Sequence, residues 1–174
     1  VKEEENKDIT TSEEVIKQLK KWCEQDLKIT PLKTLQGILW QKGYQNGELL
    51  GHVYDDVPIS LDKWKENGKK MGVFSSGSVN AQKLLFSHSV KGNLSHFFTH
   101  HFDTIIGPKR VAETYVLIAK EIALSADRIL FLSDVLEELA AADKAGMKTM
   151  QIRREDNMQV WKQSAADFSE IGLI

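Results

Sequence analysis

The stretch Met71-Gly72-Val73-Phe74-Ser75-Ser76-Gly77-Ser78 decides the fold, because a short apolar run ends abruptly in small polar residues. The run predicts a buried strand, and a helix should open at Val79. The same alternation continues toward the C-terminus. Strand-like segments at 102–106, 129–132 and 147–152 are separated by segments of helical periodicity at 110–122 and 135–145. Strands separated by helices of this length predict βαβ crossovers and a parallel α/β sheet.

The N-terminal third has helical periodicity and no strand pattern. A threonine at position 10 or 11, followed three residues later by a glutamate, predicts a capping box at the start of a helix over about 11–25. Thr30-Pro31 predicts a second helix start, since threonine caps helices and proline fits a first turn. A short helix around 60–67 should end at Gly68. We therefore divide the chain near residue 53, into a helical piece and an α/β piece.

Composition excludes several classes of protein. The 174 residues include 23 Lys plus Arg and 25 Asp plus Glu, and 41% are hydrophobic. Because both signs of charge are interspersed, the chain has no basic stripe for nucleic acid and no polybasic segment for an anionic membrane. No apolar run approaches the roughly 20 residues of a membrane-spanning helix. A single cysteine, Cys23, and the absence of a signal-peptide pattern predict a soluble cytoplasmic protein, with the nucleus also open in a eukaryote.

Polar side chains follow three of the predicted strands, and ligands of parallel sheets bind beyond the carboxyl ends of strands. Ser75 and Ser76 offer hydroxyls next to a helix N-terminus, which suits an anion. Lys109 follows a Gly-Pro turn and would neutralise phosphate charge. Asp134 ends the strand at 129–132 and suits Mg²⁺, which takes one or two carboxylates and completes its shell with water and phosphate oxygens. Together they predict a site for a phosphate and a divalent ion.

Each of these residues also has a simpler interpretation. The serines and Asp134 could cap helices, and Lys109 could be a solvated surface charge. The order of the three features along the chain favours a shared site over coincidence.

Other reactive or aromatic residues give weaker signals. His96 and His100 are four residues apart on a possible helix, a spacing that zinc can use, but no cysteine or paired acid completes the ligand set. We interpret them as partly buried or surface histidines. The four tryptophans are expected in the core or at a domain contact, and Cys23 is expected to be buried and inert. The tryptophans are Trp22, Trp40, Trp64 and Trp161.

Several segments together carry a resemblance to a known family: Leu39 to Tyr44, Phe74 to Val79, Ala81 to Phe86, Phe102 to Thr104, Lys109 with Tyr115, and Ile129 to Asp134. They resemble the enolase-phosphatases (acireductone synthases) of methionine salvage, within the haloacid dehalogenase superfamily. The resemblance covers roughly residues 30–155. The Ser-Gly and Asp landmarks are shared across the superfamily, whereas the long string from Ser75 to Phe86 is specific to this branch.

The resemblance implies a haloacid dehalogenase-like Rossmannoid parallel sheet with a helical cap. It implies a Mg²⁺-dependent phosphoric monoester hydrolase, monomeric, that enolises and then dephosphorylates 2,3-diketo-5-methylthiopentyl 1-phosphate to the acireductone. Ser75 and Ser76 would bind the substrate phosphate, Lys109 would bind it and act in catalysis, and Asp134 would coordinate Mg²⁺. Glu138 matches the second acid that the superfamily places four residues further on.

One landmark of the family has no counterpart here. The sequence contains no Asp-x-(Asp/Glu)-Gly-Thr segment, which carries the family's nucleophile at the end of a first, central strand. We therefore expect the chain to begin inside the cap insertion, with residues 1–52 a partial cap and 53–174 a partial core. The sheet should be interrupted between the strands ending at Phe74 and Leu132, and the chain alone should be unstable and inactive. A generic sugar-phosphate phosphatase and a non-catalytic binding module remain alternatives.

Overall fold

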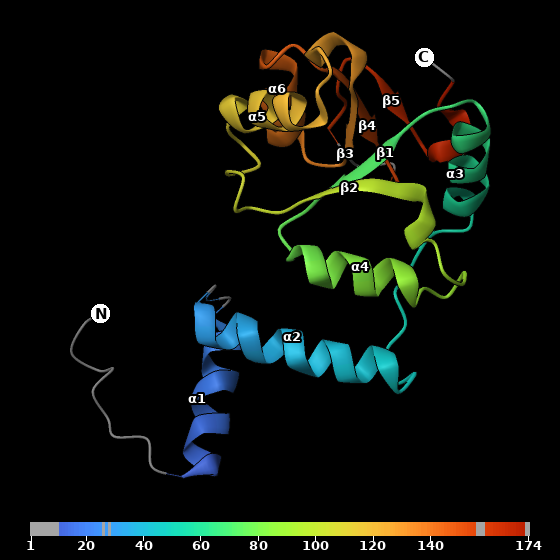
Figure 1. Ribbon diagram of the computed structural model, residues 1–174. Coiled ribbons are helices and arrows are strands. Elements are labelled where there is room, and N and C mark those ends of the chain that lie inside the picture. The colour runs from blue at the N-terminus through green and yellow to red at the C-terminus, as the bar shows by residue number, and fades with distance from the viewer. Residues whose placement is uncertain (1–10, 26, 28, 156–158, 173–174) are drawn as a thin grey trace.

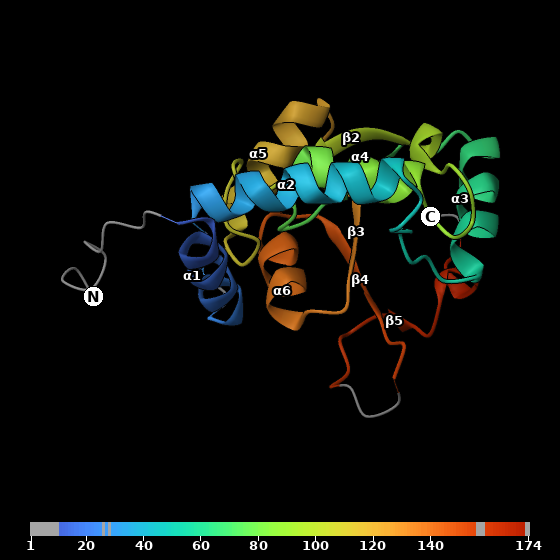
Figure 2. The ribbon, with the colours of Figure 1, turned by 90° about the horizontal axis from the view of Figure 1, so that it is seen from below.

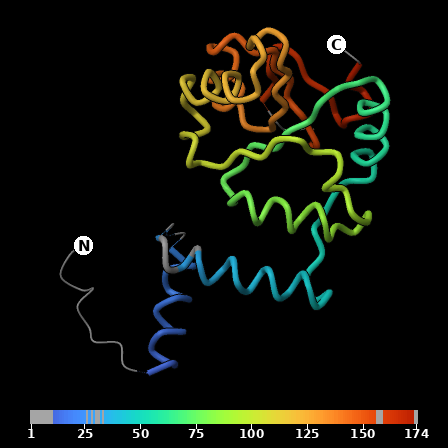
Figure 3. The backbone as a smooth tube through the Cα atoms, in the orientation of Figure 1, coloured from blue at the N-terminus to red at the C-terminus, as the bar shows by residue number. Residues whose placement is uncertain are grey.

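The computed structural model describes residues 11–25, 27, 29–155 and 159–172. Figure 1 shows two helices, α1 (Ser12–Glu24) and α2 (Thr30–Gln45), beside a larger α/β body. Figure 2 shows the same arrangement from below, and in both views α2 runs along α4 (Val79–Ser87), with which it is in contact. Figure 3 traces the connection from α2 into the body. The predicted division of the chain near residue 53 stays a prediction.

The body alternates strands and helices, as the sequence pattern predicts. In chain order its other elements are α3 (Asp56–Glu66), β1 (Met71–Phe74), β2 (Phe98–Phe102), α5 (Ala112–Ile122), β3 (Leu130–Ser133), α6 (Leu136–Lys144), β4 (Lys148–Ile152) and β5 (Ser164–Ala165). In the described part of the chain, each helix is too short or too polar to cross a bilayer.

The strands form two parallel sheets. β1 pairs with β2, so that Phe74 lies opposite Phe102. The second sheet has the order β3-β4-β5, and Ser133 lies opposite Gln151. Within the described residues, β1 and β3 belong to different sheets and are not paired with each other. The predicted interruption of the sheet between these two strands is therefore confirmed.

Tyr115 links the two sheets through the core. Its ring packs edge-on against Phe74 of β1, with centroids 5.8 Å apart, and against Phe131 of β3, at 4.9 Å. The side chain is fully buried, in a cluster that α5 and α6 share. Burying an aromatic ring of this size is one of the larger single contributions to core stability. The carboxyl ends of β1 and β3 are thus held on either side of one residue.

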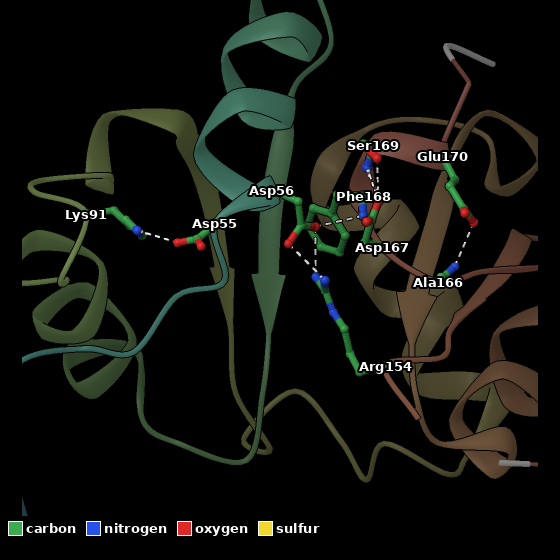
Figure 4. Close-up of polar contacts among 9 residues, drawn as sticks. All are labelled: Asp55, Asp56, Lys91, Arg154, Ala166, Asp167, Phe168, Ser169 and Glu170. Carbon is green, nitrogen blue, oxygen red and sulfur yellow. Dashed lines mark hydrogen bonds and ion pairs between the residues drawn. The ribbon is translucent and has the colours of Figure 1, made fainter. Parts of the chain in front are cut away.

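A second contact holds the C-terminal tail against α3. The two terminal guanidinium nitrogens of Arg154 donate to the Asp56 carboxylate, at 2.8 and 2.9 Å, and the Phe168 backbone N–H donates to the same group at 2.8 Å (Figure 4). The Arg154 guanidinium also lies over the Tyr54 ring, 4.2 Å from its centroid. Burial alone raises the pKa of Asp56, but the hydrogen bonds from Arg154 and Phe168 outweigh it and bring the pKa below its usual value.

Most predicted elements are confirmed, including the capping box of α1, in which Thr11 and Glu14 bond each other's backbone. Position 10, the alternative capping residue, lies outside the described residues. Gly68 has a φ of 71° just beyond α3, as a helix-ending glycine requires. The helix itself begins at Asp56, four residues before the predicted start.

The strand predicted at 102–106 is wrong. β2 covers Phe98–Phe102, and Asp103 ends it by turning its carboxylate back onto the backbone N–H of Ile105. The strand could not be recognised from the sequence, because its residues Thr99-His100-His101 are polar. β2 is stabilised by its pairing with β1 and not by an apolar pattern.

Four smaller predictions have mixed outcomes. The helix start predicted at Thr30-Pro31 is confirmed, but the capping position before α2 belongs to Ile29, which makes no side-chain cap. The predicted burial of Cys23 is wrong, because this residue is exposed. Trp40 is 41% exposed, which excludes the core and leaves the alternative of a domain contact. His96 and His100 do not share a helix, since one lies in a short 3-10 turn and the other in β2, but they are exposed and half-buried as expected.

Candidate functional site

The loop after β1 places two serines in different environments. Ser75 is partly buried: its N–H donates to the Phe102 carbonyl at 3.2 Å, and its hydroxyl donates to the Gly77 carbonyl at 3.4 Å. Ser76 is exposed. Ser78 caps α4 by accepting a hydrogen bond from the Ala81 N–H at 3.2 Å. The loop is therefore fastened at both ends, while Ser76 between them is exposed and accessible to a ligand.

The N-terminus of α4 is not the open anion site that the sequence suggests. The Val79 N–H donates to Asp103 Oδ2 at 3.2 Å, so the protein's own carboxylate occupies this position. Asp103 also accepts from the Ile105 N–H, and in this way it joins the loops after β1 and β2. This role was not predicted. The sequence gives no signal for this role, because the strand predicted at 102–106 includes Asp103.

Hydrogen bonds to the backbone at Pro108 and Lys109 hold Lys109 in place. Gly107, with a φ of 150°, allows the turn before it, and the Thr114 hydroxyl donates to the Pro108 carbonyl at 2.9 Å. The Tyr115 hydroxyl donates to the Lys109 carbonyl at 2.6 Å. Burial, followed by the Glu138 carboxylate, raises the pKa of Tyr115, so the phenol keeps its proton and remains a donor.

The Lys109 ammonium meets a buried carboxylate. Its Nζ lies 2.7 Å from Glu138 Oε2, and 5.6 Å from the centroid of the Phe74 ring at the end of β1. The two charged side chains are 20% and 10% exposed, so solvent screens this pair less than a surface pair. The ion pair orients the ammonium beside the carboxyl end of β1.

Glu138 also fixes the turn after β3. The Ser133 hydroxyl donates to Glu138 Oε2 at 3.0 Å and accepts from the Val135 N–H at 3.1 Å. Asp134, between them, has an exposed side chain. One buried acid thus links Lys109 to the end of β3, and leaves the Asp134 carboxylate accessible.

The structure therefore brings the predicted residues to the carboxyl ends of β1 and β3, which together form one rim of the molecule. Ser75 and Ser76 directly follow β1, Asp134 directly follows β3, and the Lys109–Glu138 pair connects the two strand ends. Such an arrangement can hold an anion between hydroxyls and an ammonium, with a carboxylate available for a cation. The roles of the individual residues stay predictions. Among the described residues, no group of three or more His, Cys, Asp or Glu could hold a metal ion by itself.

Solved structures show which fold this chain has. The chain superposes on the UTR4 protein of Saccharomyces cerevisiae with a TM-score of 0.82 and 30% identity, over 94% of this chain and 77% of that one. CbbY from Rhodobacter sphaeroides shares the fold with a TM-score of 0.62 at 17% identity, over 82% of this chain and 67% of that one. L-2-haloacid dehalogenases share it as well. The chain has the haloacid dehalogenase-like fold.

Curated relatives narrow the class to one family. The chain is 48% identical to enolase-phosphatase E1 of Shewanella pealeana, over 89% of this chain and 69% of that protein. It is 46% identical to enolase-phosphatase E1 of a Sulfurihydrogenibium species, over 100% of this chain and 78% of that protein. No family model matches the chain. The chain belongs to the enolase-phosphatase E1 family, whose members are phosphoric monoester hydrolases, as the sequence resemblance implied.

Proposed function

We propose that this protein is a Mg²⁺-dependent enolase-phosphatase of methionine salvage. Its substrate would be 2,3-diketo-5-methylthiopentyl 1-phosphate, which it enolises and then dephosphorylates to the acireductone. Family membership supports the reaction. The single observation that carries the site is the Lys109 ammonium, held by Glu138 between the ends of β1 and β3.

Substrate phosphate would bind between the loop after β1 and Lys109. The exposed Ser76 hydroxyl would donate to a phosphate oxygen. The Ser75 hydroxyl would do the same by turning away from the Gly77 carbonyl, to which it donates in this structure. The ammonium would neutralise charge that increases as the phosphoryl group is transferred. Because Glu138 already orients the ammonium, little reorganisation is needed when the substrate arrives. Tyr115 contributes through its hydrogen bond to the Lys109 backbone.

The residues at this rim fit a Mg²⁺ ion. Asp134 supplies an exposed carboxylate, a hard oxygen ligand, at the end of β3. Glu138 is already bonded to Lys109 and Ser133, so we assign Asp134 alone as the direct ligand in this chain, and Glu138 as the group that holds the turn. When bound, Mg²⁺ would polarise the phosphoryl oxygens.

The covalent step needs a carboxylate nucleophile, and we assign none within this sequence. Residues 1–52 would form part of a cap over the site, and 53–174 part of the core, as the resemblance implies. The enolisation base is also unassigned. We further predict that the protein is a monomer, that it is located in the cytoplasm, and that its partner is a small phosphorylated diketone.

Phosphate release by the intact natural polypeptide tests this proposal. The diketone phosphate should be turned over with Mg²⁺, and simple sugar phosphates much more slowly. Lys109→Ala and Asp134→Asn should each lower kcat by about 100-fold, the usual effect of removing one charge-stabilising group. Lys162→Ala, which removes an exposed lysine paired with Asp143, is the matched control and should leave turnover unchanged. Equal turnover of sugar phosphates would instead indicate a generic phosphatase.

A further inference from the structure

One buried glutamine lies behind the loop that carries the two serines. Gln82, on the first turns of α4, is only 5% exposed. Its Nε2 donates to the Gly77 carbonyl at 3.0 Å and to the Phe102 carbonyl at 2.7 Å. Both amide hydrogens are therefore used, one on the loop after β1 and one on the last residue of β2.

The same two carbonyls also anchor Ser75. The Gly77 carbonyl accepts from the Ser75 hydroxyl, and the Phe102 carbonyl accepts from the Ser75 N–H. Gln82 thus joins the two acceptors on which the position of Ser75 depends.

The other end of the amide is also engaged. Gln82 Oε1 lies 3.3 Å from His101 Nδ1, and since the oxygen can only accept, His101 must present its Nδ1–H. Burial, then the charges of Lys83 and His100, lower the pKa of His101 and favour this neutral ring. The amide orientation is therefore fixed from both sides.

We propose that Gln82 is a positioning residue for phosphate binding, which sets the placement of the Ser75 and Ser76 hydroxyls by tying Gly77 to Phe102. This inference rests on the proposed function, because it assumes that the loop after β1 holds the substrate phosphate. Groups that bind an anion must be preorganised to within a fraction of an ångström, and supporting hydrogen bonds provide that precision. The Asp103 carboxylate, which accepts from the Val79 N–H, also links the start of α4 to the loop after β2.

Two substitutions at position 82 test this role. Gln82→Leu removes both donors, and Gln82→Glu keeps the volume of the side chain while replacing the donating NH₂ with an oxygen. Each leaves two partly buried carbonyls without this partner. Inorganic phosphate, titrated calorimetrically into the intact polypeptide with Mg²⁺, should bind about tenfold more weakly to either variant.

The chain offers a matched control in Gln151. This glutamine is 1% exposed, and its side chain also bonds two backbone groups, the Gln159 carbonyl and the Trp161 N–H, but in the tail segment. Gln151→Leu should lower thermal stability about as much as Gln82→Leu, while phosphate affinity stays at the wild-type value. A loss of affinity confined to position 82 would support the positioning role.

Three results would overturn it. Wild-type phosphate affinity in both position-82 variants would refute the inference and leave the proposed function standing. Equal weakening in Gln151→Leu would show that affinity follows overall stability. Failure of the unsubstituted protein to bind phosphate would overturn the proposed function, and this inference with it.

Discussion

Replacing Glu138 with glutamine tests the ion pair at the centre of the site. The substitution preserves the size of the side chain and an oxygen that can accept from the Ser133 hydroxyl, but it removes the charge opposite Lys109. The ammonium would then lie partly buried without its counterion. Both stability and turnover should therefore fall.

The separation of the two groups sets the size of the effect. Opposite charges 2.7 Å apart attract by about 6 kcal/mol at an effective dielectric constant of about 20. Desolvation of both groups offsets much of this, and breaking a fully buried pair costs about 3 to 5 kcal/mol. Because Lys109 and Glu138 keep 20% and 10% exposure, we expect Glu138→Gln to lower the free energy of unfolding by about 2 to 3 kcal/mol. Because Glu138→Gln also removes the group that orients the Lys109 ammonium, the substitution should lower kcat by about 10- to 100-fold.

Urea unfolding and phosphate-release assays measure the two effects. The matched control is Asp143→Asn, which removes a carboxylate from the exposed pair with Lys162, whose side chains are 40% and 55% exposed. That change should alter stability by less than about 0.5 kcal/mol and leave turnover intact. If Glu138→Gln were no more harmful than Asp143→Asn, the ion pair would be incidental to the site.

Three further predictions concern the scaffold. Arg154→Met removes two charge-assisted hydrogen bonds to Asp56 and should lower the free energy of unfolding, measured in urea at pH 7, by about 2 kcal/mol. Because these bonds lower the pKa of Asp56 from 3.8, the difference between the two proteins is present above pH 3.8. It should shrink as the pH falls through the folded-state pKa. NMR titration should place the pKa of His101 below 6.5. The contribution of His101 to stability should decline as the pH falls from 6.5 toward the folded-state pKa, because only the unfolded state takes up the proton in that range. A measured pKa at or above 6.5 would contradict the neutral ring. Gly107→Ala places a Cβ 2.3 Å from Thr114 Oγ1 at a φ of 150° and should cost about 2 kcal/mol, so an unchanged melting temperature would refute the close contact.

Elements with their own strong signals were predictable from the sequence. β1 and the start of α4 follow from one apolar run that ends in serines and a glycine, and β3 follows from Ile129 to Leu132 in the same way. The interruption between β1 and β3 was predictable as well, because the family resemblance implies a strand between them that ends in Asp-x-(Asp/Glu)-Gly-Thr, and this sequence contains no such segment.

Features that depend on contacts between distant residues were not predictable. β2 has a polar sequence and exists through its pairing with β1, while Asp103 and Gln82 act on backbone groups supplied by other elements. Spacing along a chain does not reveal such partners. Burial of Cys23 was expected from its apolar stripe, but that face of α1 has no buried residue.

A crystal structure of the intact polypeptide with Mg²⁺ and tungstate, a stable mimic of phosphate, tests the central claim most directly. The account predicts the anion within about 3 Å of the Ser76 hydroxyl and the Lys109 ammonium, with the metal ion on the Asp134 carboxylate. Tungstate bound elsewhere, with the rim of β1 and β3 empty, would contradict it.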